Sequence, residues 1–292
     1  MLYRDRRPLL VFLAPAFLLM LVMLYYPFAL NIVNSLFEIK GMAGTPQAFL
    51  GLSNYAAMAG DATMQIAIVN SLKMMALTIV FQVGLALLLA LMVDSVRNGQ
   101  QFFRVVFFFP IVISATAIGL MFTLFYVRDG GMFNQILSLF GKGPVFWLDK
   151  GSAFTMVAIP VLWQYVGFYF VIILTGLAGI SDEIYESAAI DGATGLKKTW
   201  HITLPLIRDV LVTCATLSIT GAIKVFDLPA VIVNNGKPNG LTYFLGTYMH
   251  NQTFVAGNVD YGSAIAVVIV LLGVVLSQVV NRALMRIGGE GA

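Results

Sequence analysis

The chain has 292 residues, of which 59% are hydrophobic and 11% are charged. A soluble domain carries about one quarter charged residues, so this chain has too few polar side chains to cover a water-facing surface, and the composition indicates a membrane protein. The net charge of +3 is spread along the chain, which argues against a nucleic-acid partner.

The first apolar run follows Arg4, Arg6 and Arg7. It continues for about 20 residues, longer than the hydrophobic region of a signal peptide, and no small-x-small cleavage site follows it. We therefore expect a retained first membrane span.

Apolar runs of spanning length recur along the chain, at residues 9–30, 66–93, 105–127, 154–180, 206–233 and 262–284. Spanning strands would be about ten residues long and would alternate in polarity, so these continuous runs favour helices. We expect an all-α integral membrane protein with six transmembrane helices in a single transmembrane domain over 1–292. Kinks are expected at the prolines at positions 15, 27, 110, 160 and 229.

Lysine and arginine set the orientation, because cytoplasmic flanks carry more of them. With the N-terminus inside, the inner flanks hold Arg4, Arg6, Arg7, Arg97, Arg104, Lys197, Lys198, Arg208, Arg282 and Arg286, and the outer ones hold Lys40, Arg128, Lys142, Lys150 and Lys237. Both termini are therefore expected in the cytoplasm. The outer segments, 34–65, 128–153 and 234–261, are expected to be short re-entrant or interfacial pieces.

The inner segment 181–205 is unusually polar and about 25 residues long, more than a connection requires. Ser181 followed by two acids predicts a helix start, and the run Asp182–Ile190 predicts a short helix. Gly192 and Gly195 allow a sharp turn, and a second short helix is expected to end before Pro205. Composition alone leaves open an interfacial loop without a partner.

Two faces of this segment suggest different contacts. Ala188 and Ala189 would form a low-profile surface on which another protein can close. Trp200 and Ile202 would anchor the segment to the bilayer.

The order of residues in this segment carries a resemblance. Glu186, Ser187 and Ala188, then three residues, Gly192, nine residues, and Ile202 to Pro205 resemble the E-A-A, x3, G, x9, I-x-L-P signature of the membrane subunits of binding-protein-dependent ABC importers. Ser187 replaces the usual first alanine. The fuller pattern is similar to the maltose and glycerol-3-phosphate permeases, and Phe226 with Asp227 resembles a landmark of the first-permease type.

This resemblance implies a type I ABC importer permease fold, in which the segment forms a coupling helix docked on a separate ATPase. The residues implied in that contact are Glu186, Ser187, Ala188, Asp191, Gly192 and Ala193. It also implies a second homologous permease, a dimeric ABC ATPase that binds ATP and magnesium, an extracytoplasmic solute-binding protein, and a place in the bacterial cytoplasmic (inner) membrane.

A catalytic site is not expected in the chain itself. The run GATGLKKT, 192–199, fails the phosphate-loop pattern because Lys197 stands where the second glycine is needed. His201 and His250 fall on opposite sides of the membrane in the expected topology, and one cysteine does not make a metal cluster. We expect no metal, no cofactor bound by this chain and no ATPase activity of its own.

Polar residues inside the spans mark a candidate solute path, because they are costly in lipid. Lys224 and Asp227, three apart on the fifth helix, are expected to share a face and to pair. The remaining candidates are Gln164, Tyr165, Tyr169, Phe226 and Ser114. Rings and amides of this kind suit a sugar, with a di- or oligosaccharide expected first and a polyol or glycerol phosphate second.

Three other interpretations remain open. Lys224 and Asp227 could be a structural pair, with the tyrosines as interfacial anchors. The chain could also be an ion- or proton-coupled secondary carrier, which would leave the long inner segment unexplained. A purely structural scaffold would leave the intramembrane charges unexplained as well.

Overall fold

The computed structural model describes residues 7–39, 46–96 and 99–287. It divides into two compact units, Met1–Asp61 with Met249–Val270, and Ala62–Tyr248 with Leu271–Ala292. The expectation of one permease domain over 1–292 stays a prediction. Arg4, Arg6, Lys40 and Arg97, which were assigned to membrane flanks, lie outside the described residues.

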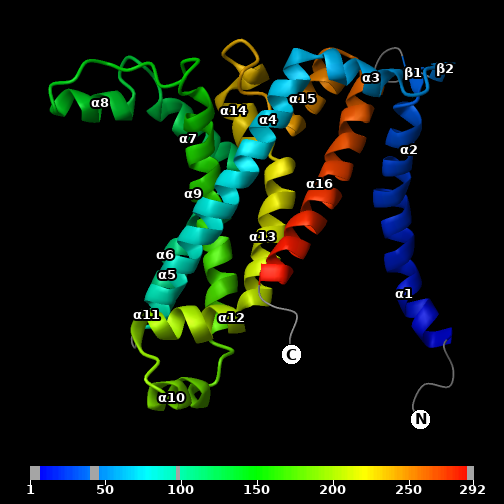
Figure 1. The fold of residues 1–292 in the computed structure, drawn as a ribbon. Coiled ribbons are helices and arrows are strands. Elements are labelled where there is room, and N and C mark those ends of the chain that lie inside the picture. Colours follow the sequence, from blue (N-terminus) through cyan, green and yellow to red (C-terminus); the bar gives the residue numbers. More distant parts are fainter. Residues whose placement is uncertain (1–6, 40–45, 97–98, 288–292) are drawn as a thin grey trace. The chain divides into compact units, whose positions relative to one another are not determined.

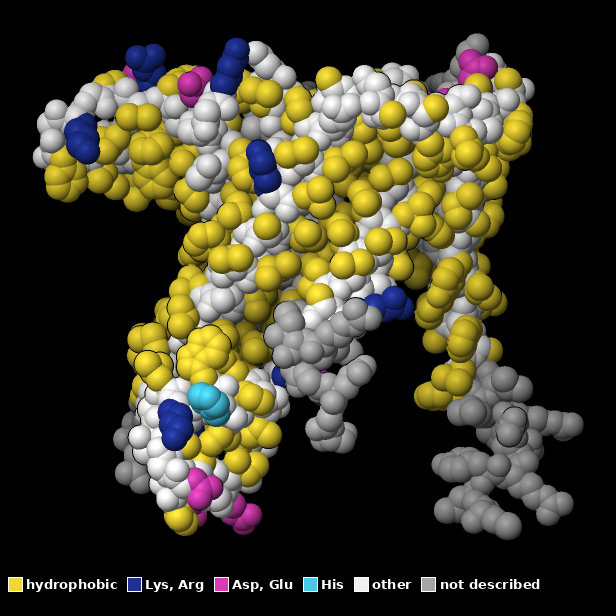
Figure 2. Space-filling model, in the orientation of Figure 1, with side chains coloured by type: hydrophobic (Ala, Val, Ile, Leu, Met, Phe, Trp, Pro, Cys, Tyr) yellow, Lys and Arg dark blue, Asp and Glu magenta, His cyan; other side chains and the backbone are white. Residues whose placement is uncertain are grey.

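Long apolar helices dominate the described chain, in agreement with the expected fold class. Five are long and apolar enough to cross a membrane: Val11–Asn34, Ala62–Asp94, Ala153–Leu177, Arg208–Ile232 and Val259–Ala283. A sixth span results if the bent pair Gln100–Val112 and Ala115–Phe125 counts as one. Hydrophobic side chains cover the long flanks of these helices, and most charged side chains lie near helix ends or in connecting segments (Figure 2).

The first unit contains the N-terminal span and the segment that follows it. The span consists of α1 (Arg7–Met20), the π turn η1 (Leu21–Tyr25) and α2 (Tyr26–Asn34), followed by α3 (Ser53–Gly60). Between them β1 (Phe37–Ile39) pairs antiparallel with β2 (Pro46–Phe49), a hairpin that the all-helical expectation did not include. The unit also holds the π turn η5 (Asn251–Val255) and the first part of α16 (Val259–Ile287).

The second unit is built around α9 (Ala153–Leu177), seen in green in Figure 1. Around it lie α4 (Ala62–Leu77), η2 (Thr78–Val83), α5 (Gly84–Asp94), α6 (Gln100–Val112), α7 (Ala115–Phe125), α13 (Arg208–Ile223) and α14 (Asp227–Ile232). The connections contain α8 (Met132–Leu139), α10 (Asp182–Ile190), α11 (Gly195–Lys198), η3 (Thr199–Thr203), α12 (Leu204–Leu206), η4 (Asn234–Gly236) and, at the edge of the unit, α15 (Leu245–His250).

The contact between α6 and α9 depends on Gly167. A Cβ atom at this position would lie 1.8 Å from the Phe107 carbonyl oxygen and 2.9 Å from the Phe108 Cα atom. Only a residue without a side chain permits this distance, as is typical of helix pairs packed in lipid. Phe170, which is fully buried, adds an edge-to-face contact with Phe107 at 5.2 Å between ring centroids.

Prolines affect the helices in different ways. Pro160 lies inside the unbroken α9, and Pro27 and Pro205 each follow a five-residue π turn by two positions. In both turns the hydrogen bond spans five residues, from the Tyr26 and Leu204 amides to the carbonyls of Leu21 and Thr199. The expectation that the second short helix ends before Pro205 was therefore wrong, because proline is tolerated in the first turn of a new helix.

Asn70 ties α4 to the segment before α15. Its Nδ2 donates to the carbonyl oxygens of Leu241 and Tyr243, at 2.8 and 2.9 Å, and the side chain is 5% exposed. The next residue, Ser71, accepts a hydrogen bond from the Leu245 amide. A polar side chain in an apolar run thus satisfies the backbone of a distant connection.

Candidate functional site

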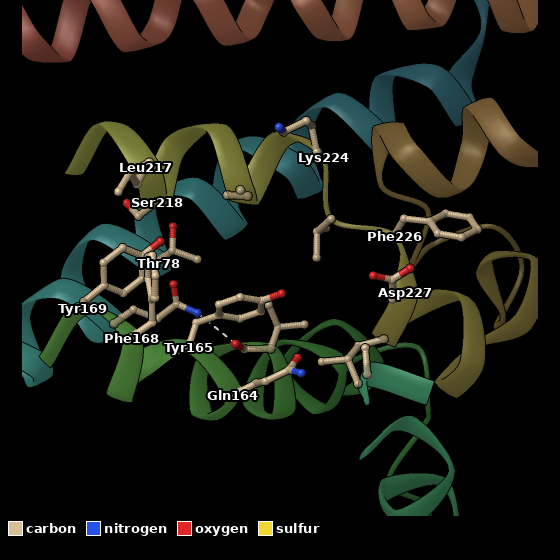
Figure 3. A pocket seen from close by; sticks show the side chains of 17 residues that line it. Thr78, Gln164, Tyr165, Phe168, Tyr169, Leu217, Ser218, Lys224, Phe226 and Asp227 are labelled. Carbon is tan, nitrogen blue, oxygen red and sulfur yellow. Dashed lines mark hydrogen bonds between the residues drawn. The ribbon is translucent and has the colours of Figure 1, made fainter. Parts of the chain in front are cut away.

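A cavity of about 320 Å³ lies inside the second unit, between η2, α9, α13 and the start of α14 (Figure 3). Six of the seven expected solute-path residues line it: Gln164, Tyr165, Tyr169, Lys224, Phe226 and Asp227. Ser114 does not. It is exposed and stands at the N-cap position of α7 without a side-chain capping bond.

Gln164 links the cavity to a break in the third span. The helix axis bends by 86° between α6 and α7, where Ile113 and Ser114 are extended. A kink was expected at Pro110, and the break lies three residues after it. The Gln164 Nε2 atom donates to the Ile113 carbonyl oxygen at 3.3 Å, which helps to satisfy the broken helix end.

The other end of the same amide has no partner. Gln164 is 3% exposed, and its Oε1 atom is buried without a hydrogen bond from any described residue. A buried acceptor left unsatisfied costs about 1–3 kcal/mol. This atom is therefore a candidate to receive a hydrogen bond from a solute or a water in the cavity.

The expected pairing of Lys224 with Asp227 was wrong. Helix α13 ends at Ile223, Lys224 is its C-cap residue, and Asp227 begins α14. Pro229 lacks the amide proton that would continue the helix across this break. Figure 3 shows the Lys224 side chain pointing away from Asp227.

Asp227 instead lies near an aromatic residue of α9. It interacts electrostatically with Tyr165, which lines the same cavity. Figure 3 shows Tyr165 beneath the cavity and the Phe226 ring extending away from it. Within the described part of the chain, neither Lys224 nor Asp227 has a recorded ion pair.

Two lining residues on η2 were missed by the sequence reasoning, Thr78 and Gln82. Gln82 is 2% exposed and donates from Nε2 to the Val161 carbonyl oxygen at 2.8 Å. Both interrupt an apolar span, the same signal that singled out Gln164, so the signal was present in the sequence.

The cavity thus combines amides, hydroxyls, aromatic rings and one charge of each sign. Such a lining can hydrogen-bond a polyhydroxylated solute and cover its apolar face. No group of three or more metal-ligating side chains occurs in the described ranges.

The segment 181–205 forms a second candidate site, at the end of the unit where α5 finishes and α6 begins (Figure 1). Helix α10 has the expected bounds, Asp182–Ile190, and Ser181 is at its N-cap position, although without a capping side-chain bond. Its C-terminus is closed by the Ala193 and Gly192 amides, which donate to the Ala188 and Ala189 carbonyls at 2.8 and 3.1 Å.

This pair of bonds is the Schellman arrangement, in which the residue after the C-cap adopts a left-handed conformation. Gly192 holds that position with φ +75°, and Gly195 follows with φ +55°. The turn expected at the two glycines is confirmed, and its geometry explains why glycine is suited to position 192.

Tyr185 braces α10 against the chain that returns to the membrane. The Lys198 ammonium lies 4.4 Å from the Tyr185 ring centroid, and the Thr203 hydroxyl lies 3.4 Å from the Tyr185 hydroxyl. Lys198 also interacts electrostatically with Asp94 at the end of α5. These contacts were not expected from sequence, because they join residues that no local spacing relates.

The face available to a partner differs from the expected one. Ala188 is only 7% exposed and is buried against its own chain, whereas Ala189 is exposed, so the expected open face was wrong for Ala188 alone. Glu186, Ser187 and Asp191 are exposed. Ile190 and Leu196, with exposed fractions of 88% and 78%, present apolar side chains that the sequence reasoning overlooked.

Similarity to known proteins assigns the chain to a family. Residues 82–286 match the family described as the binding-protein-dependent transport system inner membrane component. The chain is 33% identical over 272 residues to the probable ABC transporter permease protein YurN of Bacillus subtilis, covering 91% of this chain and 92% of that protein. It is 29% identical to AraP of the same species, an arabinooligosaccharides transport system permease protein, covering 99% and 92%.

A solved structure shares the fold. A chain of a bacterial ABC transporter involved in the import of the acidic polysaccharide alginate superposes with a TM-score of 0.83 at 22% identity, covering 97% of this chain and 96% of that one. The resemblance inferred from Glu186 to Pro205 is thereby confirmed. This chain belongs to the inner membrane components of binding-protein-dependent transport systems, and it is a multi-pass ABC transporter permease, not itself the ATPase.

Proposed function

We propose that this permease forms half of the translocation path of an ATP-driven sugar importer, and that its cavity binds a di- or oligosaccharide during passage. A second homologous permease supplies the other half, a dimeric ATPase binds ATP and magnesium, and an extracytoplasmic binding protein delivers the sugar. Both termini and the segment 181–205 face the cytoplasm.

The observation that carries the solute proposal is the unpartnered Oε1 atom of Gln164 in the cavity wall. The cavity volume of about 320 Å³ falls in the range of small-molecule sites. Sugar hydroxyls can donate to this atom, and the rings of Tyr165 and Phe168 can cover a pyranose face. The arabinooligosaccharide permease and the alginate transporter support a carbohydrate over an amino acid or an ion.

The coupling proposal rests on the rigidity of α10. A helix closed by a Schellman turn and braced through Tyr185 can transmit a push without bending, as a two-state contact requires. We propose that Ile190 and Leu196 enter an apolar groove of the ATPase, with Glu186 and Asp191 facing basic groups at its edge.

The solute path can be tested with the intact importer in proteoliposomes, using radiolabelled oligosaccharides. Asp227→Asn and Gln164→Ala should raise the half-saturating sugar concentration about tenfold, because the first replaces a charged acceptor with a neutral amide and the second removes an acceptor, each a loss of roughly 1.5 kcal/mol. Asp129→Asn and Gln135→Ala are matched controls, since both residues are exposed and outside the cavity. Unchanged half-saturation in both cavity variants would remove these residues from the path.

The coupling contact can be tested at two glycines where a side chain would have room. A Cβ at Gly192 or Gly195 has no atom of the described residues within 4 Å, so alanine at either position costs only the strain of a left-handed backbone, about 1 kcal/mol. We expect Gly192→Asp to abolish ATP-driven uptake while the protein stays inserted, and Gly195→Ala to keep most of it. Normal uptake by the Gly192→Asp variant would refute the coupling role.

The energy source separates this proposal from a secondary carrier. Uptake should stop when ATP is withdrawn from proteoliposomes that retain their ion gradients, and the purified permease should bring an ATPase with it. Accumulation of sugar by the permease without an ATPase would refute the proposed function.

A further inference from the structure

A shallow groove lies on the surface of the second unit, along the contact between α6 and α9. It has a volume of about 330 Å³ and is lined by Gln101, Arg104, Val105, Phe108, Phe109, Val112 and Val171. Phe109 and Val112 are 60% and 71% exposed. The groove is thus lined mainly by apolar side chains, with the Arg104 guanidinium and the Gln101 amide at the end near the start of α6.

The cation in this groove lacks a partner. The Arg104 Nε atom is buried without a hydrogen bond to any described residue, and no carboxylate of the described ranges pairs with its guanidinium. An unpaired, partly buried charge is costly, so such a group is expected to find an anion. Arginine presents two parallel donors that suit a phosphate or a carboxylate.

The position of Arg104 narrows the choice of anion. Arg104 lies in the first half of α6, and the groove reaches Val171 in the second half of α9, the half that leads into the segment 181–205. On the proposed orientation this is the cytoplasmic leaflet. A basic group at that depth beside an apolar channel is suited to a lipid that has an anionic headgroup and an acyl chain.

We propose that this groove binds one anionic phospholipid, whose phosphate is held by Arg104 and Gln101 and whose acyl chain lies over Phe108, Phe109 and Val112. The length of the groove along α6, from position 101 to 112, is about three helical turns, or roughly 16 Å. That distance accommodates the phosphate and glycerol of the headgroup and the first part of an acyl chain. A free phosphate would leave the aromatic surface exposed and gain only the polar contact.

Another groove in the second unit serves as an internal comparison for the Arg104 groove. It is lined by Lys73, Phe81, Phe154, Ile159 and neighbouring apolar residues, at the opposite end of α9. The Lys73 ammonium there is already placed over the Phe154 ring, 5.7 Å from its centroid. Lysine also offers a point charge rather than a planar pair of donors, so this groove is expected to be the weaker site for a phosphate.

The test uses the intact importer in nanodiscs and native mass spectrometry of retained lipid. With phosphatidylglycerol diluted in phosphatidylcholine, we expect one phosphatidylglycerol to be retained, and Arg104→Gln to lower its affinity about tenfold or more, as loss of a charged hydrogen bond predicts. Arg104→Lys should give an intermediate value, and Lys73→Gln should leave it unchanged. Equal retention by wild type and the Arg104→Gln variant would overturn the proposal.

Three further measurements do not use the Arg104 variants. The wild-type importer should bind phosphatidylglycerol at least tenfold more tightly than phosphatidylcholine, and inorganic phosphate should not displace it at equal concentration. A photoreactive residue at Val112 should capture lipid in native membranes. Equal affinity for the two lipids, displacement by inorganic phosphate, or capture of a protein partner at Val112 would each refute lipid occupancy of the groove.

Discussion

Replacing Gly167 with alanine tests how closely α6 and α9 must approach for the fold. The added Cβ would lie 1.8 Å from the Phe107 carbonyl oxygen. A carbon and a carbonyl oxygen normally come no closer than about 3.3 Å, so α6 would have to move by about 1.5 Å. Backbone atoms cannot rotate away from this contact as a side chain could.

Two opposing energies decide the outcome. Alanine gains about 1 kcal/mol over glycine inside a helix, whereas overpacking a tight contact costs about 1–3 kcal/mol and more when backbone must shift. Because the blocked atoms belong to the α6 backbone, we expect the upper end of that range and a net loss of about 2 kcal/mol. Transport should fall as well, since Gln164 and Tyr169 flank this contact on α9.

The assay is the temperature at which the detergent-solubilised permease loses its monodisperse peak in size-exclusion chromatography. Gly84→Ala is the matched control, because Gly84 is helical and a Cβ there meets nothing within 4 Å. We expect Gly167→Ala to melt several degrees below wild type and the control to melt at or above it. Equal melting of all three proteins would refute the reasoning from close approach.

Further outcomes follow from single contacts. Asn70→Ala should expose the segment 234–244 to protease, because it removes two hydrogen bonds worth about 1 kcal/mol each. The control Asn31→Ala loses one exposed hydrogen bond to Pro27 and should not increase cleavage of this segment. Equal cleavage of the two variants would contradict the role assigned to Asn70. Tyr185→Leu should reduce ATP-coupled uptake by removing the ring beside Lys198, a contact worth about 0.5–1 kcal/mol. Tyr185→Phe keeps the ring, so loss of uptake in that variant would show that the hydroxyl matters instead.

Local signals predicted the segment 181–205 well. The bounds of α10 follow from Ser181, the acids of the first turn and the glycine after the last helical residue, all of which act within a few positions. The brace through Tyr185 could not be predicted in this way, because Tyr185 and Thr203 are joined only when the segment folds back. The burial of Ala188 has the same origin.

The membrane spans show the same difference between what local sequence predicts and what packing decides. Apolar length located the helical runs, but it carries no information on where a helix breaks inside a run. The break after Ile223 separates Lys224 from Asp227, and the one after Val112 turns Ser114 away from the cavity. Pro110 and Pro229 predicted a kink near each break, but its position and sharpness depend on how a neighbouring helix shares the backbone hydrogen bonds, which composition does not specify.

The two polar atoms of the Gln164 side-chain amide have different surroundings. Its nitrogen donates to the Ile113 carbonyl oxygen at the break between α6 and α7, while its Oε1 atom is buried without a hydrogen bond from any described residue. A solute that draws this nitrogen toward the cavity would withdraw the hydrogen bond from the Ile113 carbonyl. Occupancy of the cavity would then change the hydrogen bonding of the break through this one side chain.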